Sequence, residues 1–380
     1  MSARAQPATA VAHDAAAVPG RRAWRWVVGW WAAGRLLVAA AAVAAAALPS
    51  GPDPHARGVS SGLQLWDGWW YLQVARHWYD PAFAHGQTAA FAPGFPALWR
   101  ALMLIPGPPA LIAGIANSLV FLAALAVVHV LTRRVLDERR ARLTVLVMAL
   151  FPVSFVYSLP YSESLFLLLA AGSFLLLDRR RDGAGAALAA LACVVRPTGL
   201  TVAAGLAVAV WRRGRRARAS ALTAVALLAT AAVVAGVGIA AHDPLAQFNA
   251  QQSGWGRGLG FPPLVVWRYL DTNLVHFRHP LRAVTDTAFL GLWTVLGVKL
   301  WRMRVAPEYI VFAAAAVAMP LVGGSALSMG RFGMVAFPFS WALADWADAG
   351  TARLRLTAGL LAAGLLMLEV ASLHASAYVP

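Results

Sequence analysis

The sequence predicts an all-α polytopic membrane protein. Three observations support this class: 60% of the 380 residues are apolar, only 13% are charged, and the mean hydropathy is +0.64. Soluble domains carry about 25% charged residues. The apolar residues also form separate runs, and each bilayer crossing needs about 20 of them. We expect a bundle of about 11 transmembrane helices (roughly 10–12) in a single membrane domain over residues 23–375.

The first elements are an N-terminal segment and a long apolar run. Residues 1–22 are Ala-rich and polar, and we expect a disordered cytoplasmic segment there. The run 24–48 is longer than the apolar part of a signal peptide, which predicts an uncleaved signal-anchor helix. Its Ala-rich end before Pro49 also resembles a cleavage site, which is the alternative.

The remaining apolar runs predict the other spans, which are roughly 108–131, 143–158, 163–177, 184–195, 198–211, 220–241, 283–300, 309–327, 332–347 and 354–372. Two of these runs are short and are divided by Arg196 and Pro197. We expect them to be half-helices that meet inside the protein, where a broken backbone is tolerated.

Charge predicts the orientation. With a cytoplasmic N-terminus, most of the 32 Lys and Arg residues fall in cytoplasmic connections, as the positive-inside rule requires. Two long segments, about 49–107 and 242–282, then lie outside, and long loops on a membrane scaffold usually serve function. We therefore expect a multi-pass protein of the cell membrane whose site is on the extracytoplasmic face.

Composition and spacing exclude several other classes. The net charge of +16 is divided into short clusters between apolar runs, so no nucleic-acid-binding domain is predicted. The single cysteine, Cys193, excludes an intrachain disulfide and a Cys-based metal site. No two of the nine histidines have a helical metal-binding spacing. We therefore predict no metal and no cofactor.

The first outer segment contains the most informative residue, Asp67, in Trp66-Asp67-Gly68-Trp69-Trp70-Tyr71. Residues 65–79 predict a short helix at the membrane surface, because Trp and Tyr rings suit the headgroup layer. A carboxylate in this environment is costly unless it is used or paired. Two interpretations stay open and are compatible: Asp67 caps the helix, or it is a general base.

Three charged residues occupy predicted outer turns, and each has a simpler alternative. Glu163 begins a helix, where the helix dipole favours an anion. The alternative is that Glu163 makes a polar contact within the active site, because it lies on the same outer face as Asp67. Arg196 suits a lipid phosphate or, equally, a carboxylate partner such as Glu163. Arg331 contradicts the positive-inside bias, and snorkelling to headgroups is its alternative.

The second outer segment contains Asp243, Gln251, Trp255 and Arg257. Asp243 precedes a proline, which is an ordinary turn signal. Amide, indole and guanidinium groups close together also suit the binding of sugar and phosphate. Phe91-Ala92-Pro93-Gly94-Phe95-Pro96 closes the first outer segment, and a plain turn back into the membrane accounts for it.

These stretches together resemble the PIG-V family of GPI-type mannosyltransferases, in its bacterial branch. The matching pieces are Trp66-Asp67-Gly68-x-Trp70-Tyr71, Phe91-x-Pro93-x-x-Pro96, Phe151-Pro152-x-Ser154-Phe155, Pro160-Tyr161-Ser162-Glu163-Ser164, Arg196-Pro197-Thr198-Gly199, Asp243-Pro244-Leu245, Trp255-Gly256-Arg257 and Arg331-Phe332. The resemblance implies a GT-C-fold glycosyltransferase whose donor is polyprenyl-phosphate-linked mannose, with inversion at the sugar. The family's catalytic acid maps onto Asp67. A lipid or glycan acceptor is expected.

We therefore expect Asp67 to deprotonate the acceptor hydroxyl, and Arg196, Arg331 or Arg257 to neutralise the leaving phosphate. The other predicted substrate-binding residues are Trp66, Trp70, Tyr71, Glu163, Asp243, Gln251 and Trp255. The expected partners are polyprenyl-phosphate mannose, the acceptor, membrane lipids and, as a possibility, a membrane subunit. Two alternatives remain: a flippase or transporter of a lipid-linked sugar, and a non-catalytic subunit of a glycosyltransferase complex.

Overall fold

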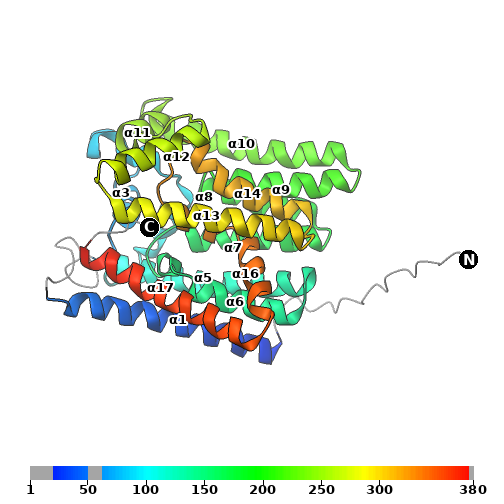
Figure 1. The fold of residues 1–380 in the computed structure, drawn as a ribbon. Helices are drawn as coiled ribbons and strands as arrows, with labels where there is room; N and C mark the ends of the chain where they lie inside the picture. Colours follow the sequence, from blue (N-terminus) through cyan, green and yellow to red (C-terminus); the bar gives the residue numbers. More distant parts are fainter. Residues whose placement is uncertain (1–19, 50–61, 376–380) are drawn as a thin grey trace, which may run out of the picture.

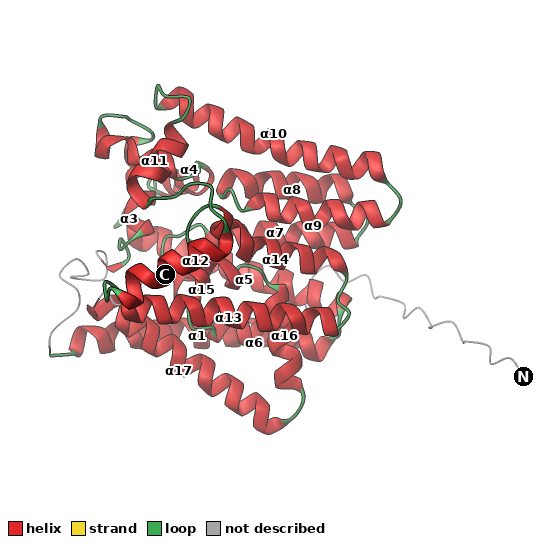
Figure 2. Cartoon of the chain, turned by 45° about the horizontal axis from the view of Figure 1, so that its top comes forward, coloured by secondary structure: helices red, strands yellow, loops and turns green. Residues whose placement is uncertain are grey.

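A computed structural model describes residues 20–49 and 62–375 (Figure 1). Over these residues the chain is helical and forms no strand, as Figure 2 shows, so the predicted all-α class is confirmed. The predicted disordered segment 1–22 lies outside the described residues except at its end, where Arg21 begins the first helix. Residues 50–61 of the first outer segment also lie outside them.

The described helices follow one another along the chain with short connections. They are α1 (Arg21–Ala47), α3 (Asp67–His77), η2 (Phe83–Ala90), α4 (Gly94–Leu102), α5 (Pro109–Val135), α6 (Glu138–Leu150), η3 (Ser154–Tyr157), α7 (Glu163–Asp178), α8 (Asp182–Val195), α9 (Gly199–Arg212), α10 (Arg216–Ala240), α11 (Ala246–Trp255), α12 (Pro262–Leu270), η4 (Asp271–Val275), α13 (Pro280–Arg302), α14 (Pro307–Val322), α15 (Met329–Met334), α16 (Pro338–Asp348) and α17 (Thr351–Ala375).

Two predicted spans end earlier than expected, because hydropathy does not register a break in the backbone. The run 143–158 is helical only to Leu150, since the residue before Pro152 is extended, as prolines require. The chain then forms the short helix η3. The run 309–327 stops at Val322, where two glycines follow and the second has a positive φ.

A third predicted span, 332–347, is divided between α15 and α16. Pro338 begins α16 at the first helical position, where its missing N–H is not needed. In the described part of the chain, five helices are long and apolar enough to cross a bilayer: α1, α5, α10, α13 and α17. The membrane class is thus supported, and the number of crossings stays a prediction.

The predicted break at Arg196 and Pro197 is present. Helices α8 and α9 lie beside each other (Figure 2), and the turn between them is buried, since Arg196 is 7% and Thr198 is 8% exposed. A Cβ atom at Gly199 would lie 2.2 Å from the Cys193 backbone nitrogen. Glycine therefore permits a turn this tight.

The arginine-rich connections gather at one end of the bundle, on the right in Figure 1. Ion pairs join them: Arg212 Nη1 lies 2.9 Å from Glu308 Oε2, and Arg213 Nη1 lies 3.2 Å from Asp182 Oδ1. Helices α3, α11 and α12 lie at the opposite end. This separation matches the alternation that the sequence predicts, and the two outer segments share one end.

Candidate active site

Four charged side chains meet at the end of the bundle that carries α3. Arg331 Nη1 donates to Asp67 Oδ2 at 2.5 Å. Arg331 Nε lies 3.1 Å from Glu163 Oε1 without hydrogen-bond alignment. Arg196 Nη1 donates to the same Glu163 oxygen. We call these four residues the buried charge cluster. Their ion pairs form a chain in the order Asp67, Arg331, Glu163 and Arg196, so Arg331 and Glu163 each have two partners.

The cluster assembles residues that are far apart in the sequence. Asp67 begins α3, Glu163 begins α7, Arg196 lies in the turn between α8 and α9, and Arg331 lies in α15. Their side chains are 21%, 1%, 8% and 7% exposed, in that order. Buried charges need partners, and two carboxylates with two guanidiniums supply them. Asp67 is the most exposed member and therefore the one best placed to meet a ligand.

The predicted helix at Asp67 is present, but the capping interpretation is wrong. Trp66 is the N-cap residue, with φ of 51°, and Asp67 is the first helical residue. Its carboxylate is bonded to Arg331, which lies 264 residues further along the chain. Gly68 allows this end of the helix to pack closely, because a Cβ there would lie 2.8 Å from the Leu63 carbonyl oxygen.

The alternatives for the other three residues are decided by their contacts. Glu163 begins α7, as the dipole interpretation expects, and it also pairs with two arginines; its role within an active site stays a prediction. Arg196 pairs with the Glu163 carboxylate, which is the simpler of its two interpretations. Snorkelling is wrong for Arg331, which is buried and paired.

Aromatic rings pack against the two arginines. The Arg196 guanidinium lies 5.4 Å from the Phe332 ring centre and 5.9 Å from that of Phe166. Arg331 lies 5.5 Å from the Tyr161 ring centre. Cation–π contacts of this kind favour a guanidinium that has lost water. Tyr161 was not among the predicted site residues, although it stands in the same Pro160-to-Ser164 motif as Glu163.

Electrostatics keep Arg331 charged. Burial acts to lower the pKa of Arg331, but the carboxylates of Asp67 and Glu163 outweigh burial and raise this pKa above its ordinary value. Burial raises the pKa of the Tyr161 hydroxyl well above 10.0, and the charge of Asp67 adds to this effect. Tyr161 therefore stays neutral and acts as a hydrogen-bond donor, to the Leu65 carbonyl at 3.4 Å.

The segments 62–107 and 242–282, which the sequence places on one face, contact each other beside the cluster. Trp70 of α3 and Trp255 of α11 make an edge-to-face contact at 5.3 Å, and Phe91 lies against both rings at 6.0 and 5.4 Å. Gln251 Nε2 donates to the Ala90 carbonyl at 2.8 Å. Tyr71 Oη and Ser162 Oγ are hydrogen-bonded at 2.7 Å, which joins α3 to the start of α7.

Arg257 is also close to the cluster but differs from its arginines. Its Nη1 donates to Gln251 Oε1 at 3.4 Å, and none of the ion pairs among the described residues includes it. Burial lowers the pKa of Arg257 below its ordinary value; Asp67 opposes this shift, and Arg331 adds to it. Arg257 is therefore within electrostatic reach of the cluster and has no acidic partner there.

Asp243 is not brought to the cluster. Its carboxylate accepts from the Leu245 backbone N–H at 2.8 Å and from Asn249 Nδ2 at 2.9 Å. These are the bonds of a local turn, which was the simpler interpretation of Asp-Pro. Among residues 20–49 and 62–375 no three His, Cys, Asp or Glu side chains gather as metal ligands do.

Solved structures of similar fold support the predicted GT-C-like helical bundle. The fold is similar to that of the oligosaccharyltransferase of Archaeoglobus fulgidus. Its apo form has a TM-score of 0.53 and 15% identity, covering 93% of this chain and 56% of that chain. The form tethered to an acceptor peptide has a TM-score of 0.51 and 12% identity, covering 94% and 56%.

The sequence comparisons match one family over part of the chain. The family model described as Mannosyltransferase (PIG-V) matches residues 39–215. The GPI alpha-1,6-mannosyltransferase 2 of Rattus norvegicus is 34% identical over 164 residues, and that of Mus musculus is 33% identical over 164 residues. Each match covers 40% of this chain, and the chain spans about a third (32%) of these relatives. The predicted resemblance to the PIG-V mannosyltransferase family is thus confirmed.

Proposed function

We propose that this protein is an integral-membrane mannosyltransferase. It moves mannose from a polyprenyl-phosphate-linked donor to a lipid or glycan acceptor, with inversion, at the extracytoplasmic face. The observation that carries the proposal is the buried charge cluster, in which one partly exposed carboxylate, Asp67, is held by a buried arginine beside two converging outer segments. The names of the curated relatives support mannose as the sugar.

Asp67 is the general base in this proposal. Arg331 holds its Oδ2, and Oδ1 is the oxygen that we assign to the acceptor. The acceptor O–H proton passes to Asp67, and the acceptor oxygen forms a bond to the anomeric carbon. The bond from that carbon to the phosphate oxygen breaks, and its electron pair leaves with the polyprenyl phosphate. Attack opposite the leaving group converts a β-linked donor into an α-mannoside.

The leaving phosphate gains a second negative charge and needs a cation. Arg331 and Arg196 are already paired with carboxylates, so Arg257 is the arginine most available to contact it. Electrostatic stabilisation of developing charge is usually the largest contribution to catalysis. A guanidinium also matches two phosphate oxygens at once. Gln251 orients Arg257 through its hydrogen bond.

The aromatic residues at the junction of the outer segments form the rest of the proposed substrate site. Trp70 and Trp255 supply apolar ring faces next to the charged groups. Trp66 and Tyr71 hold the start of α3 through the cap position and the Ser162 hydrogen bond. The donor and the acceptor would reach this site from the membrane, and a membrane subunit is a further possible partner.

The test is sugar transfer in membranes from radiolabelled polyprenyl-phosphate mannose to a panel of lipid and glycan acceptors. We expect Asp67→Asn to lower turnover by at least about 10²–10⁴-fold, the usual contribution of general-base catalysis. The matched control is Asp80→Asn, an exposed aspartate of the same outer segment that accepts from the Ala82 N–H at 2.9 Å.

Two results would contradict the proposal. Turnover near the wild-type value in Asp67→Asn, at a normal protein level, would remove Asp67 from the role of base. No labelled product from wild-type protein with any acceptor would reject the mannose donor and favour a flippase of lipid-linked sugars.

A further inference from the structure

Helix α15, which carries Arg331, is hydrogen-bonded to helix α13 through its first residue, Met329. Helix α15 has only six residues, too few to be stable through its own hydrogen bonds. The Met329 N–H donates to Asp286 Oδ1 at 2.9 Å. The Met329 carbonyl accepts from Trp293 Nε1 at 2.8 Å. Both backbone groups of Met329 are thus bonded to side chains of α13.

Asp286 replaces the cap that α15 does not supply for itself. Its N-cap residue, Ser328, has a left-handed backbone with φ of 66° and makes no capping bond with its side chain. The first N–H groups of any helix need an acceptor from outside the helix. Asp286 is 1% exposed and provides that acceptor from α13. A carboxylate at this position is also favoured by the helix dipole.

Two further contacts complete the arrangement. Tyr269 Oη donates to Asp286 Oδ2 at 2.6 Å, so both carboxylate oxygens are occupied. Gly333 packs closely against the Trp293 ring, where a Cβ atom would come within 2.1 Å of Cε2. Helix α15 is therefore fixed at its first residue by hydrogen bonds and at its fifth by close packing. We call Asp286 and Trp293 the α15 clamp.

We propose that the α15 clamp positions Arg331 against Asp67 and Glu163. Arg331 follows Met329 by two residues, and its guanidinium must reach Asp67 Oδ2 at 2.5 Å and Glu163 Oε1 at 3.1 Å. Asp286 and Trp293 act through Arg331 and are positioning residues. The structural part of this inference is independent of the reaction, and its consequence for turnover rests on the proposed function.

Positioning is distinguished from general stabilisation by coupling between sites. Residues in one network show non-additive effects, whereas independent sites add. The first experiment measures how far Asp67→Asn lowers the thermal unfolding midpoint in detergent, in three backgrounds: wild type, Trp293→Phe and Trp341→Phe. Trp341 is the matched control, because it is also buried and its Nε1 donates to Thr132 Oγ1 at 2.7 Å, away from α15.

We expect Asp67→Asn to shift the midpoint equally in wild type and Trp341→Phe, and by less in Trp293→Phe, where Arg331 is no longer held. Equal shifts in all three backgrounds would overturn the proposal. The outcome needs no transfer activity, so it stands whether or not the protein moves mannose. Asp286→Ala, as a fourth background, tests the other half of the clamp and should also reduce the shift.

The second experiment measures transfer kinetics. A displacement of about 1 Å in a catalytic group costs up to about 100-fold in rate, so Trp293→Phe and Asp286→Ala should lower kcat within that range and change the acceptor KM little. Asp286→Asn should rescue turnover, because its amide oxygen accepts from Met329 and its amide nitrogen donates to Tyr269. Trp341→Phe should keep wild-type kcat.

An unchanged kcat in both clamp variants would overturn the catalytic consequence. Coupling of the unfolding midpoints without any transfer by wild-type protein would instead confirm the clamp and reject the proposed function.

Discussion

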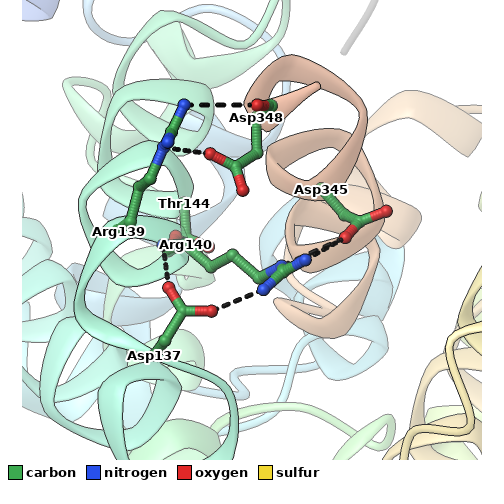
Figure 3. A network of polar contacts seen from close by, with 6 residues as sticks. All are labelled: Asp137, Arg139, Arg140, Thr144, Asp345 and Asp348. Carbon is green, nitrogen blue, oxygen red and sulfur yellow. Dashed lines mark hydrogen bonds and ion pairs between the residues drawn. The ribbon is translucent and has the colours of Figure 1, made fainter. Parts of the chain in front are cut away.

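Ion pairs occur at both ends of the bundle, but their side chains differ in exposure to solvent. At the arginine-rich end, Asp137, Arg139 and Arg140 of the α6 start contact Asp345 and Asp348 of α16 (Figure 3). We call these five residues the peripheral network. Its side chains are between 19% and 72% exposed. In the buried charge cluster, three of the four side chains are at most 8% exposed.

The peripheral network joins the start of α6 to the end of α16 through ion pairs. Arg140 Nη1 lies 2.5 Å from Asp137 Oδ2, and its Nη2 lies 2.8 Å from Asp345 Oδ1. Asp137 is the N-cap of α6 and accepts from the Arg140 backbone N–H at 2.7 Å. Partial burial acts to raise the pKa of Asp137, but these bonds outweigh it and lower the pKa below 3.8. Asp137 is therefore ionised at neutral pH, and structure alone explains the network.

The difference shows why only one of the two groups points to function. Exposed ion pairs contribute about 0–1 kcal/mol and form readily wherever opposite charges meet at a surface. Buried ones carry a desolvation cost of several kcal/mol per ion, which well-packed apolar residues would avoid. Buried ionisable groups gathered in one place are therefore candidates for function.

The largest effect on stability is expected for Glu163→Gln. This change leaves Arg196 and Arg331 buried with only Asp67 as a carboxylate. Removing one partner of a buried pair costs about 3–5 kcal/mol, so the free energy of unfolding should fall by that amount. Denaturant titration in detergent, followed by tryptophan fluorescence, measures it.

The matched control for Glu163→Gln is Asp345→Asn. Asp345 also serves two cations, Arg140 at 2.8 Å and Lys299 at 2.7 Å, but it is 22% exposed. Each exposed pair contributes about 0–1 kcal/mol, so the loss should be far smaller. If the two variants lose similar amounts, burial does not distinguish the two groups and the comparison fails.

An intermediate effect is expected for Arg196→Lys. Lysine keeps the charge but loses the planar fork that reaches Glu163 and stacks between Phe166 and Phe332. We expect a loss of about 1–3 kcal/mol, the common range for damage to a buried polar network. The same titration measures it, with Arg139→Lys in the peripheral network as control. A loss no larger than that of the control would show that the geometry of Arg196 is unimportant.

The sequence predicted the all-α class and the shared end of Asp67 and Glu163, because hydropathy and charge alternation decide both. The short helices α4, α11 and α12 were not predicted, since they lie in the long segments between apolar runs. It did not predict the helix ends near Leu150 and Val322, since the apolar runs continue past them. The partners of Asp67 and Arg196 were also left open. The local sequence around Asp67 is the same whether it caps a helix or acts as a base. The local sequence around Arg196 likewise does not distinguish a phosphate partner from a carboxylate partner.

Asp286 was missed for a different reason. It lies inside the predicted span 283–300 and was read as part of an apolar run. A single carboxylate within such a run was the available signal, because ionisable residues inside a membrane usually have a specific partner. That partner, the Met329 backbone N–H, is a group that every residue carries, so no sequence pattern identifies it.

The smallest effect is expected for Arg140→Ala, and it sharpens the comparison through its response to salt. Arg140 is 34% exposed and holds Asp137 and Asp345, so its removal should cost about 0–1 kcal/mol per pair. At 1 M salt the screening length falls to about 3 Å, and this cost should largely disappear.

The cost of Glu163→Gln should persist at the same salt concentration, since water and ions do not reach a side chain that is 1% exposed. Unfolding titrations of both variants at low and high salt measure the two responses. A cost for Glu163→Gln that also vanished with salt would mean that solvent ions reach the cluster, and its charges would then resemble those of the peripheral network.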